Sequence, residues 1–131
     1  MLQENNLQIE KFDPEVLREY DIRGIVDKNI TENTAYTIGR VYGYIVIEKL
    51  SSNKVSLGYD GRLTSPKLYN ALSNGLKDAG IDVMNIGMCP TPMLYFADYH
   101  LKTDAGIMIT GSHNPSEYNG FKMVLNKHSF Y

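Results

Sequence analysis

Short apolar runs alternate with longer stretches of helical periodicity along most of this chain. Runs typical of buried strands lie at 54–59, 82–86, 105–110 and 121–125. Before and between these runs, apolar residues recur at helical spacing in three stretches: from Thr31 for roughly 18 residues, from Ser65 to Ala79, and over 93–101. Strands that alternate with helices in this way predict a layered α/β fold with a largely parallel sheet.

Local signals place the ends of these elements. Ser65 followed by Pro66 predicts an N-cap and a first helical residue, and Gly80 predicts a left-handed C-terminal cap. Gly39 and Gly43 are four residues apart within the first predicted helix, so we expect this helix to pack closely against a sheet. The charged segment 18–24 ends at a glycine and is interpreted as a loop or a short edge strand.

Length and charge restrict the class of protein. The 131 residues suffice for one domain, with 15 acidic and 13 basic residues and a net charge of −2, which disfavours nucleic acid or an anionic membrane as the main partner. A single cysteine, Cys89, excludes an internal disulfide framework. With no membrane-spanning run and no secretory signal, we expect a cytoplasmic domain over 12–131, preceded by a flexible segment 1–11.

Polar loops follow three of the predicted strands, at 59–65, 87–91 and 110–119. Ligands of open α/β sheets bind at the carboxyl ends of strands, so these loops are the candidate binding regions. In the last loop Gly111 permits close backbone approach, Ser112 supplies a hydroxyl, and successive N–H groups form a candidate anion nest. Lys122 brings a cation back to the same region. The pattern predicts an anion-binding loop.

Simpler interpretations remain open for each of these residues. Asn114 before a proline is typical of an ordinary turn, and Asp60 with Arg62 equally fits a turn closed by a salt bridge. Arg23 alone fits a surface ion pair, and Tyr20 fits ordinary packing. Composition and spacing therefore support an anion-binding α/β domain and do not identify a reaction.

The phrases REYDIRG at 18–24, GYDGRLTSP at 58–66 and GIMITGSHNPSEYNGFKM at 106–123 carry a specific resemblance. In this order and spacing the chain resembles the α-D-phosphohexomutases, especially the phosphomannomutase/phosphoglucomutase branch. These are multi-domain enzymes several times longer than this chain. The resemblance implies their domain I, a three-layer α/β/α sandwich with a mixed, largely parallel sheet, ending here before its last helix.

The family interconverts hexose 1-phosphates and hexose 6-phosphates through a bisphosphorylated sugar. By resemblance, Ser112 is the phosphoryl donor and acceptor, and its phosphate supplies one ligand to a magnesium ion. Lys122, Arg23 and His113 match positions for acid–base and charge-stabilising work, and the residues leave open whether Lys122 or His113 accepts the serine proton. The matched substrate-side or loop-ordering positions are Tyr20, Arg18 and Asn114.

The resemblance also implies partners and alternatives. The substrate is a phosphosugar, glucose or mannose 1,6-bisphosphate is the activator, and the remaining domains belong to the same polypeptide, so we expect residues 1–131 alone to be inactive. One alternative is a phosphoglucosamine mutase domain, although those enzymes usually have alanine at the position of Gly111. Another is a non-catalytic anion-binding module.

Overall fold

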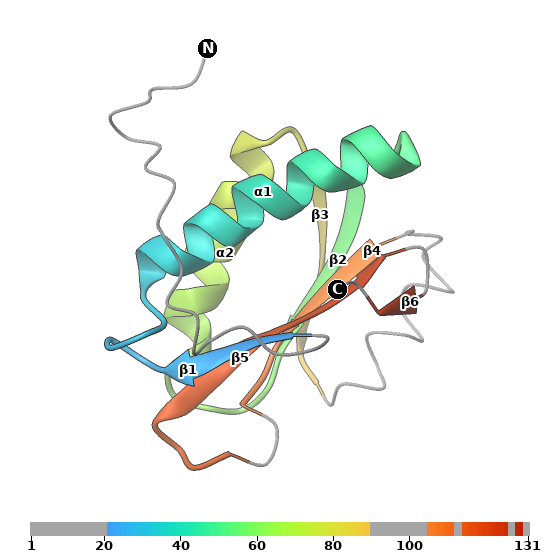
Figure 1. The fold of residues 1–131 in the computed structure, drawn as a ribbon. Helices are drawn as coiled ribbons and strands as arrows, with labels where there is room; N and C mark the ends of the chain where they lie inside the picture. The colour runs from blue at the N-terminus through green and yellow to red at the C-terminus, as the bar shows by residue number, and fades with distance from the viewer. Residues whose placement is uncertain (1–20, 90–104, 112–113, 126–127, 130–131) are drawn as a thin grey trace.

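The computed structural model describes residues 21–89, 105–111, 114–125 and 128–129 (Figure 1). Within these ranges the chain forms two helices and six strands. In chain order they are β1 (Asp21–Ile25), α1 (Glu32–Leu50), β2 (Lys54–Tyr59), α2 (Ser65–Asp78), β3 (Asp82–Met88), β4 (Ala105–Ile109), β5 (Tyr118–Leu125) and β6 (His128–Ser129).

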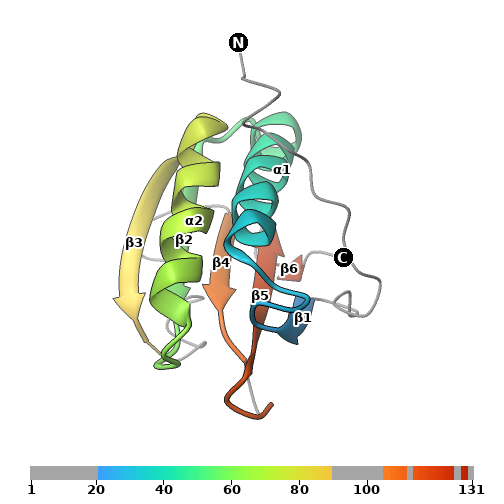
Figure 2. The ribbon, with the colours of Figure 1, turned by 90° about the vertical axis from the view of Figure 1, so that its left-hand side faces the viewer.

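The strands form one mixed sheet in the order β1-β5-β4-β2-β3, with β6 also paired to β5. Strand β2 is parallel to both β3 and β4, whereas β5 is antiparallel to β4, β1 and β6. Because β5 alone runs against the others, β2, β3 and β4 all end at one edge, toward which the arrows of β3 and β4 point in Figure 2. The predicted mixed α/β sheet is confirmed.

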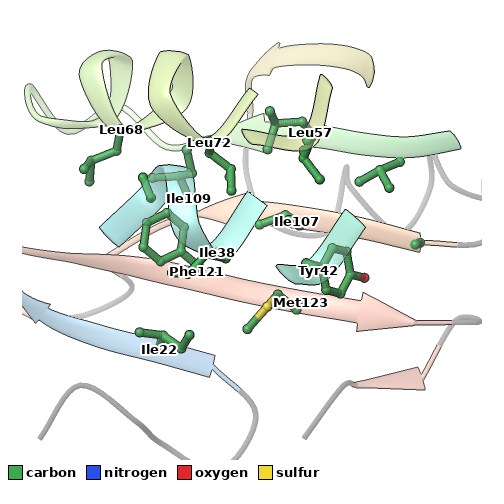
Figure 3. Packing of buried hydrophobic residues seen from close by; sticks show 14 of the residues in the cluster. Ile22, Ile38, Tyr42, Leu57, Leu68, Leu72, Ile107, Ile109, Phe121 and Met123 are labelled. Carbon is green, nitrogen blue, oxygen red and sulfur yellow. The ribbon is translucent and has the colours of Figure 1, made fainter. Parts of the chain in front are cut away.

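Both described helices cover the same face of the sheet (Figure 2). Their apolar stripes meet alternate residues of the strands, such as Ile107 and Ile109 of β4, in one continuous core (Figure 3). Met108, between these two, points to the opposite face, where it contacts Ile86 and Cys89. The helix predicted over 93–101, which would supply a third layer, lies outside the described residues, as does segment 1–11.

The start of α1 and the end of α2 are stabilised by local hydrogen bonds. Thr31 and Thr34 form a reciprocal capping box at the start of α1, with both bonds at 3.1 Å. At the end of α2, Gly80 has φ +99° and forms the predicted left-handed cap. The predicted N-cap of α2 is wrong by one residue: Thr64 occupies that position, without a capping side-chain bond, and Ser65 is the first helical residue.

The close packing of α1 is against α2 rather than against the sheet, which corrects our expectation. A Cβ on Gly39 would overlap the backbone of Leu72, and a Cβ on Gly75 would overlap the Tyr36 carbonyl oxygen. A Cβ on Gly43 would lie 2.8 Å from that of Ala79. The glycines therefore let the two helix backbones touch.

Neither described helix is long and apolar enough to cross a membrane.

Strand β1 agrees with the sequence-based expectation, whereas strand β5 differs from it. The segment 18–24, interpreted as a loop or edge strand, contributes the edge strand β1, and β5 begins at Tyr118 rather than Phe121. The longer β5 arises because its first residues pair with β1, from Ile25 opposite Tyr118 to Asp21 opposite Lys122. This pairing brings the arm that contains Arg23 beside the strand that contains Lys122.

Candidate functional site

The candidate site lies at the edge where β2 and β4 end, which we call the carboxyl edge. Tyr59 and Ile109 are register partners there, and the Asp60 N–H donates to the Ile109 carbonyl at 2.9 Å. The β2–α2 loop (60–64) and the β4–β5 loop (110–117) therefore leave the sheet side by side. The described parts of these loops are held together by polar contacts.

The Asp60 carboxylate is the centre of these contacts. Its Oδ1 accepts from the Arg62 N–H at 3.1 Å and from the Ser65 hydroxyl at 2.8 Å. Its Oδ2 accepts from the Gly111 N–H at 3.0 Å and from the Arg62 Nε–H at 3.3 Å. Every one of these partners is a donor, so the site is built for an ionised carboxylate.

Two opposing effects set the pKa of Asp60. Burial disfavours the charged form and acts to raise the pKa, whereas hydrogen bonds from Arg62, Ser65, Gly111 and Thr110 act to lower it. The hydrogen bonds prevail, and the pKa of Asp60 lies below its ordinary value. Asp60 is thus an acceptor held in its charged form rather than a general acid.

The Arg62 guanidinium crosses from Asp60 to the far end of the β4–β5 loop. Its Nη1 donates to the carbonyls of Pro115 at 2.7 Å and Tyr118 at 3.2 Å, and its Nη2 donates to the carbonyl of Asn114 at 2.8 Å. The expected Asp60–Arg62 salt bridge is present at 3.3 Å. Arg62 therefore does more than close its own turn with Asp60, because it also binds three carbonyls of another segment.

Gly111 lies directly against this guanidinium. A Cβ at Gly111 would overlap Cζ and Nε of Arg62, so the arginine occupies the space that a side chain would need. The Gly111 carbonyl accepts from the Asn114 N–H at 3.0 Å, which links the two described parts of the β4–β5 loop. The predicted close approach at Gly111 is confirmed, and it is made by a side chain of the same domain.

A buried polar side chain also stabilises the contacts around Asp60. Asn119 of β5 is fully buried, and its Nδ2 donates to the Thr64 hydroxyl at 2.9 Å and to the Ser65 hydroxyl at 3.1 Å. The Ser65 hydroxyl in turn donates to the Asp60 carboxylate. The hydroxyl interpreted from sequence as a helix cap is therefore a link between β5 and the Asp60 carboxylate.

The two predicted cations share one face of the sheet. Ile22 and Phe121 are register partners and belong to the core on the helix side. Arg23 and Lys122, each the next residue along its strand, therefore project from the opposite face. Arg23 is the register partner of Gly120, so the two side chains occupy diagonal positions on neighbouring strands.

Arg23 is also bound to the β4–β5 loop. Its Nη1 donates to Oδ1 of Asn114 at 3.0 Å. A Cβ on Gly120 would overlap the Ile22 carbonyl oxygen and approach the Arg23 Cα, so this glycine lets β1 lie close against β5. The structure thus brings Arg23 and Asn114 into contact, and places Lys122 on the same sheet face as Arg23, diagonally across the β1–β5 pair.

The remaining predicted site residues, Ser112, His113, Tyr20 and Arg18, lie outside the described residues. Sequence reasoning missed the contributions of Ser65 and Asn119. It also underestimated Asp60 and Arg62, although the phrase GYDGRLTSP that contains them was part of the resemblance. That phrase was the sequence signal that could have identified Asp60 and Arg62 as site residues.

The described part of the chain offers few ligands for a metal ion. Those residues contain no group of three His, Cys, Asp or Glu side chains that could hold an ion. Asp60, whose carboxylate contacts the β4–β5 loop, already accepts from four donors. The described side chains therefore do not form a magnesium site by themselves.

Comparison with known proteins agrees with this geometry. Residues 14–129 match the family model described as phosphoglucomutase/phosphomannomutase, alpha/beta/alpha domain I. The chain belongs to this family. A phosphoglucomutase from Neisseria gonorrhoeae is 50% identical over 111 residues, which are 85% of this chain. A phosphomannomutase/phosphoglucomutase from Pseudomonas putida is 49% identical over 110 residues, 84% of this chain.

A solved structure is similar as well. A phosphoglucomutase/phosphomannomutase family protein from Burkholderia thailandensis superposes with a TM-score of 0.85 and 40% sequence identity, covering 92% of this chain and 28% of that protein. The chain spans about a quarter of the curated relatives' length, 24% in both cases. The similarity is therefore to one domain of longer mutases, the domain I that the sequence motifs indicated.

Proposed function

We propose that this chain is the phosphoserine-bearing domain I of a longer phosphomannomutase/phosphoglucomutase, with Ser112 as the residue that donates and accepts the phosphoryl group. Family membership supports the reaction class, an interconversion of hexose 1-phosphate and hexose 6-phosphate. The observation that carries the proposal is the bond of Arg23 to Asn114, two residues beyond Ser112, on the sheet face that also bears Lys122.

This arrangement suits phosphoryl transfer. The reaction depends chiefly on positioning and on positive charge near the phosphoryl oxygens. Arg23 and Lys122 supply that charge from the sheet, whereas the N–H groups of Gly111 and Asn114, which the sequence predicts as part of an anion nest, already donate to acceptors within the domain. Serine needs a group to take its proton when it attacks a phosphosugar, and Lys122 and His113 are the candidates.

The proposal includes magnesium and a sugar bisphosphate. A phosphate on Ser112 would offer one oxygen to magnesium, an ion that takes several oxygen ligands and commonly combines carboxylates with phosphate. By the family resemblance the other ligands belong to further segments of the longer polypeptide, and the described residues contain no acidic cluster that could replace them. Glucose or mannose 1,6-bisphosphate would prime the serine. We expect the 131-residue chain alone to show no mutase turnover.

One observation favours the mannose and glucose branch over phosphoglucosamine mutases. The Arg62 guanidinium occupies the space of a Cβ at Gly111. An alanine, which is usual at this position in phosphoglucosamine mutases, would require the arginine to lie elsewhere. Assaying the longer polypeptide with mannose, glucose and glucosamine phosphates tests the branch, and preferential turnover of glucosamine phosphate would contradict it.

Mass spectrometry of the intact longer polypeptide tests the role of Ser112. We expect one labile phosphate that disappears in S112A together with turnover. Ser116 lies exposed in the same loop, so S116A is the matched control and should keep both phosphate and turnover. Retention of the phosphate in S112A would place the phosphoryl group elsewhere, and binding of phosphate without any turnover in the wild type would support an anion-binding module.

A further inference from the structure

We infer that Asp60 and Arg62 are positioning residues that fix the loop at Gly111, before Ser112, and at Asn114–Tyr118, after it, and so set where the serine hydroxyl meets the phosphosugar. This inference rests on the proposed function of Ser112. It assigns a role to two residues outside the cationic group of Arg23 and Lys122. The contacts of the two residues lie at positions 111 and 114–118, on either side of that serine.

The first contact fixes Gly111, the entry to the segment that contains Ser112. The Gly111 N–H donates to Oδ2 of Asp60 at 3.0 Å. Because Asp60 also receives bonds from Ser65 and from the Arg62 backbone, its carboxylate cannot follow a moving loop without breaking contacts with α2 and its own turn. An amide at this position would have to present an NH₂ group to donors, so asparagine does not replace the aspartate.

The second contact fixes the exit. Arg62 donates to the carbonyls of Asn114, Pro115 and Tyr118, while its Nε donates back to Asp60. These four acceptors are matched to the planar fork of a guanidinium. A lysine has one nitrogen and cannot reach all of them, although it preserves the charge. The geometry of the arginine, rather than its charge, is therefore what the loop uses.

The two anchors, Asp60 at Gly111 and Arg62 at Asn114–Tyr118, are coupled to each other. The same guanidinium holds the exit through Asn114 and lies against the entry at Gly111, where it leaves no space for a Cβ. Consecutive Cα atoms are held about 3.8 Å apart by covalent geometry. Fixing Gly111 and Asn114 therefore restricts the two residues between them, and a displacement of about 1 Å at a reacting group lowers rates by roughly 10²-fold.

The test uses the longer polypeptide with the variants R62K and D60N. We expect each variant to lower kcat by about 10- to 100-fold while KM for the phosphosugar stays nearly unchanged, because substrate contacts are intact and only the reacting group is displaced. Asp27 forms an exposed ion pair with Lys67 at 3.0 Å, so D27N is the matched control for the carboxylate charge that D60N removes. It should retain wild-type kcat.

A double-mutant cycle separates positioning from a general loss of structure. Since G111A and R62K both remove the same contact, their combined effect on kcat should be no larger than the greater single effect, whereas independent defects would multiply. Multiplicative losses, a wild-type kcat in R62K and D60N, or a rise confined to KM would each overturn the inference. Thermal unfolding of every variant establishes that the compared proteins are folded.

Labelling at Ser112 distinguishes this inference from the function on which it rests. With a labelled sugar bisphosphate, the wild type should carry label on Ser112, and R62K and D60N should acquire it more slowly. A wild type that never carries label on Ser112 contradicts the proposed function, and with it the positioning of Ser112 by Asp60 and Arg62. A labelled wild type with equally fast variants contradicts the positioning role alone.

Discussion

The carboxyl edge and the α1–α2 interface both bring two chain segments together across glycines, but they use different groups to do so. At the interface, Gly75 lies against the carbonyl of Tyr36, and Gly39 lies against the backbone of Leu72. At the edge, Gly111 lies against the side chain of Arg62. A helix backbone cannot yield without unpacking its neighbours, whereas a side chain can rotate away. The interface therefore determines stability, and the edge determines the position of a loop.

The arginines of the two regions show the same contrast. Arg40 at the interface is 9% exposed, donates to the Tyr36 hydroxyl at 3.3 Å, and has an Nε without a hydrogen-bond partner among the described residues. Arg62 at the edge donates through Nε and both terminal nitrogens. The guanidinium of Arg62, with all three of its nitrogens bonded, specifies the conformation of the segment that it binds. The buried side chain of Arg40 mainly fills space between the helices.

The largest expected effect on stability is that of G75A. Its new methyl group would meet the Tyr36 carbonyl, so we expect the free energy of unfolding to fall by about 3 kcal/mol and the melting temperature by roughly 10 °C. Urea and thermal unfolding of the chain measure this. The neighbouring exposed Asn74 provides the control N74A, which should be close to wild type. A G75A variant as stable as N74A would show that the interface is not tightly packed.

A smaller loss of stability is expected for D60N. The asparagine presents an NH₂ group to at least one of the donors now bound by the carboxylate, which lowers the free energy of unfolding by about 2 kcal/mol. The control D27N removes a charge from an exposed pair and should change stability by less than about 0.5 kcal/mol. Equal effects of the two substitutions would mean that the edge network adds nothing beyond a surface charge.

The contribution of Asp60 should also depend on pH. Its pKa is lower in the folded than in the unfolded chain, because its hydrogen bonds outweigh burial. Its stabilising effect is therefore complete above the ordinary aspartate pKa and is lost as the pH falls through the folded-state pKa. Urea unfolding between neutral and acidic pH should show the wild type and D60N converging in acid. A constant difference across this range would contradict the assignment.

The smallest expected effect on stability is that of G111A. Because its methyl group meets a side chain that can rotate, and water can replace the partly exposed hydrogen bonds that Arg62 then gives up, we expect a loss of about 1 kcal/mol, below that of G75A. Urea unfolding of both variants makes the comparison. If G111A were as destabilising as G75A, the edge would be a structural element of the same kind as the helix interface.

The two regions also differ in how far sequence predicts them. Helical and strand periodicity identified α1, α2 and the central strands, because burial of one face imposes that spacing. The partner of Gly39 was assigned wrongly to the sheet, since a small residue indicates close approach but not what approaches. Ser65 was assigned to a cap because a hydroxyl before proline suits that role as well as a bond to Asp60.

The edge network was not predictable for a further reason. Arg62 binds carbonyls 52, 53 and 56 residues away, and a backbone acceptor leaves no signature in the residue type that carries it. Asn119 likewise reaches Thr64 and Ser65 only after the sheet is assembled. The motifs located the site through resemblance, and the contacts within it required the fold.

Amide hydrogen exchange at Gly111, compared between the wild type and D60N, tests the central claim most directly. Its N–H donates to Asp60, so it should exchange slowly in the wild type and at least about 10-fold faster in D60N, where the bond is lost. The amide of Ile107, in the centre of the sheet between β2 and β5, should exchange equally slowly in both. Equal exchange at Gly111 in the two proteins would contradict the claim that Asp60 holds the loop.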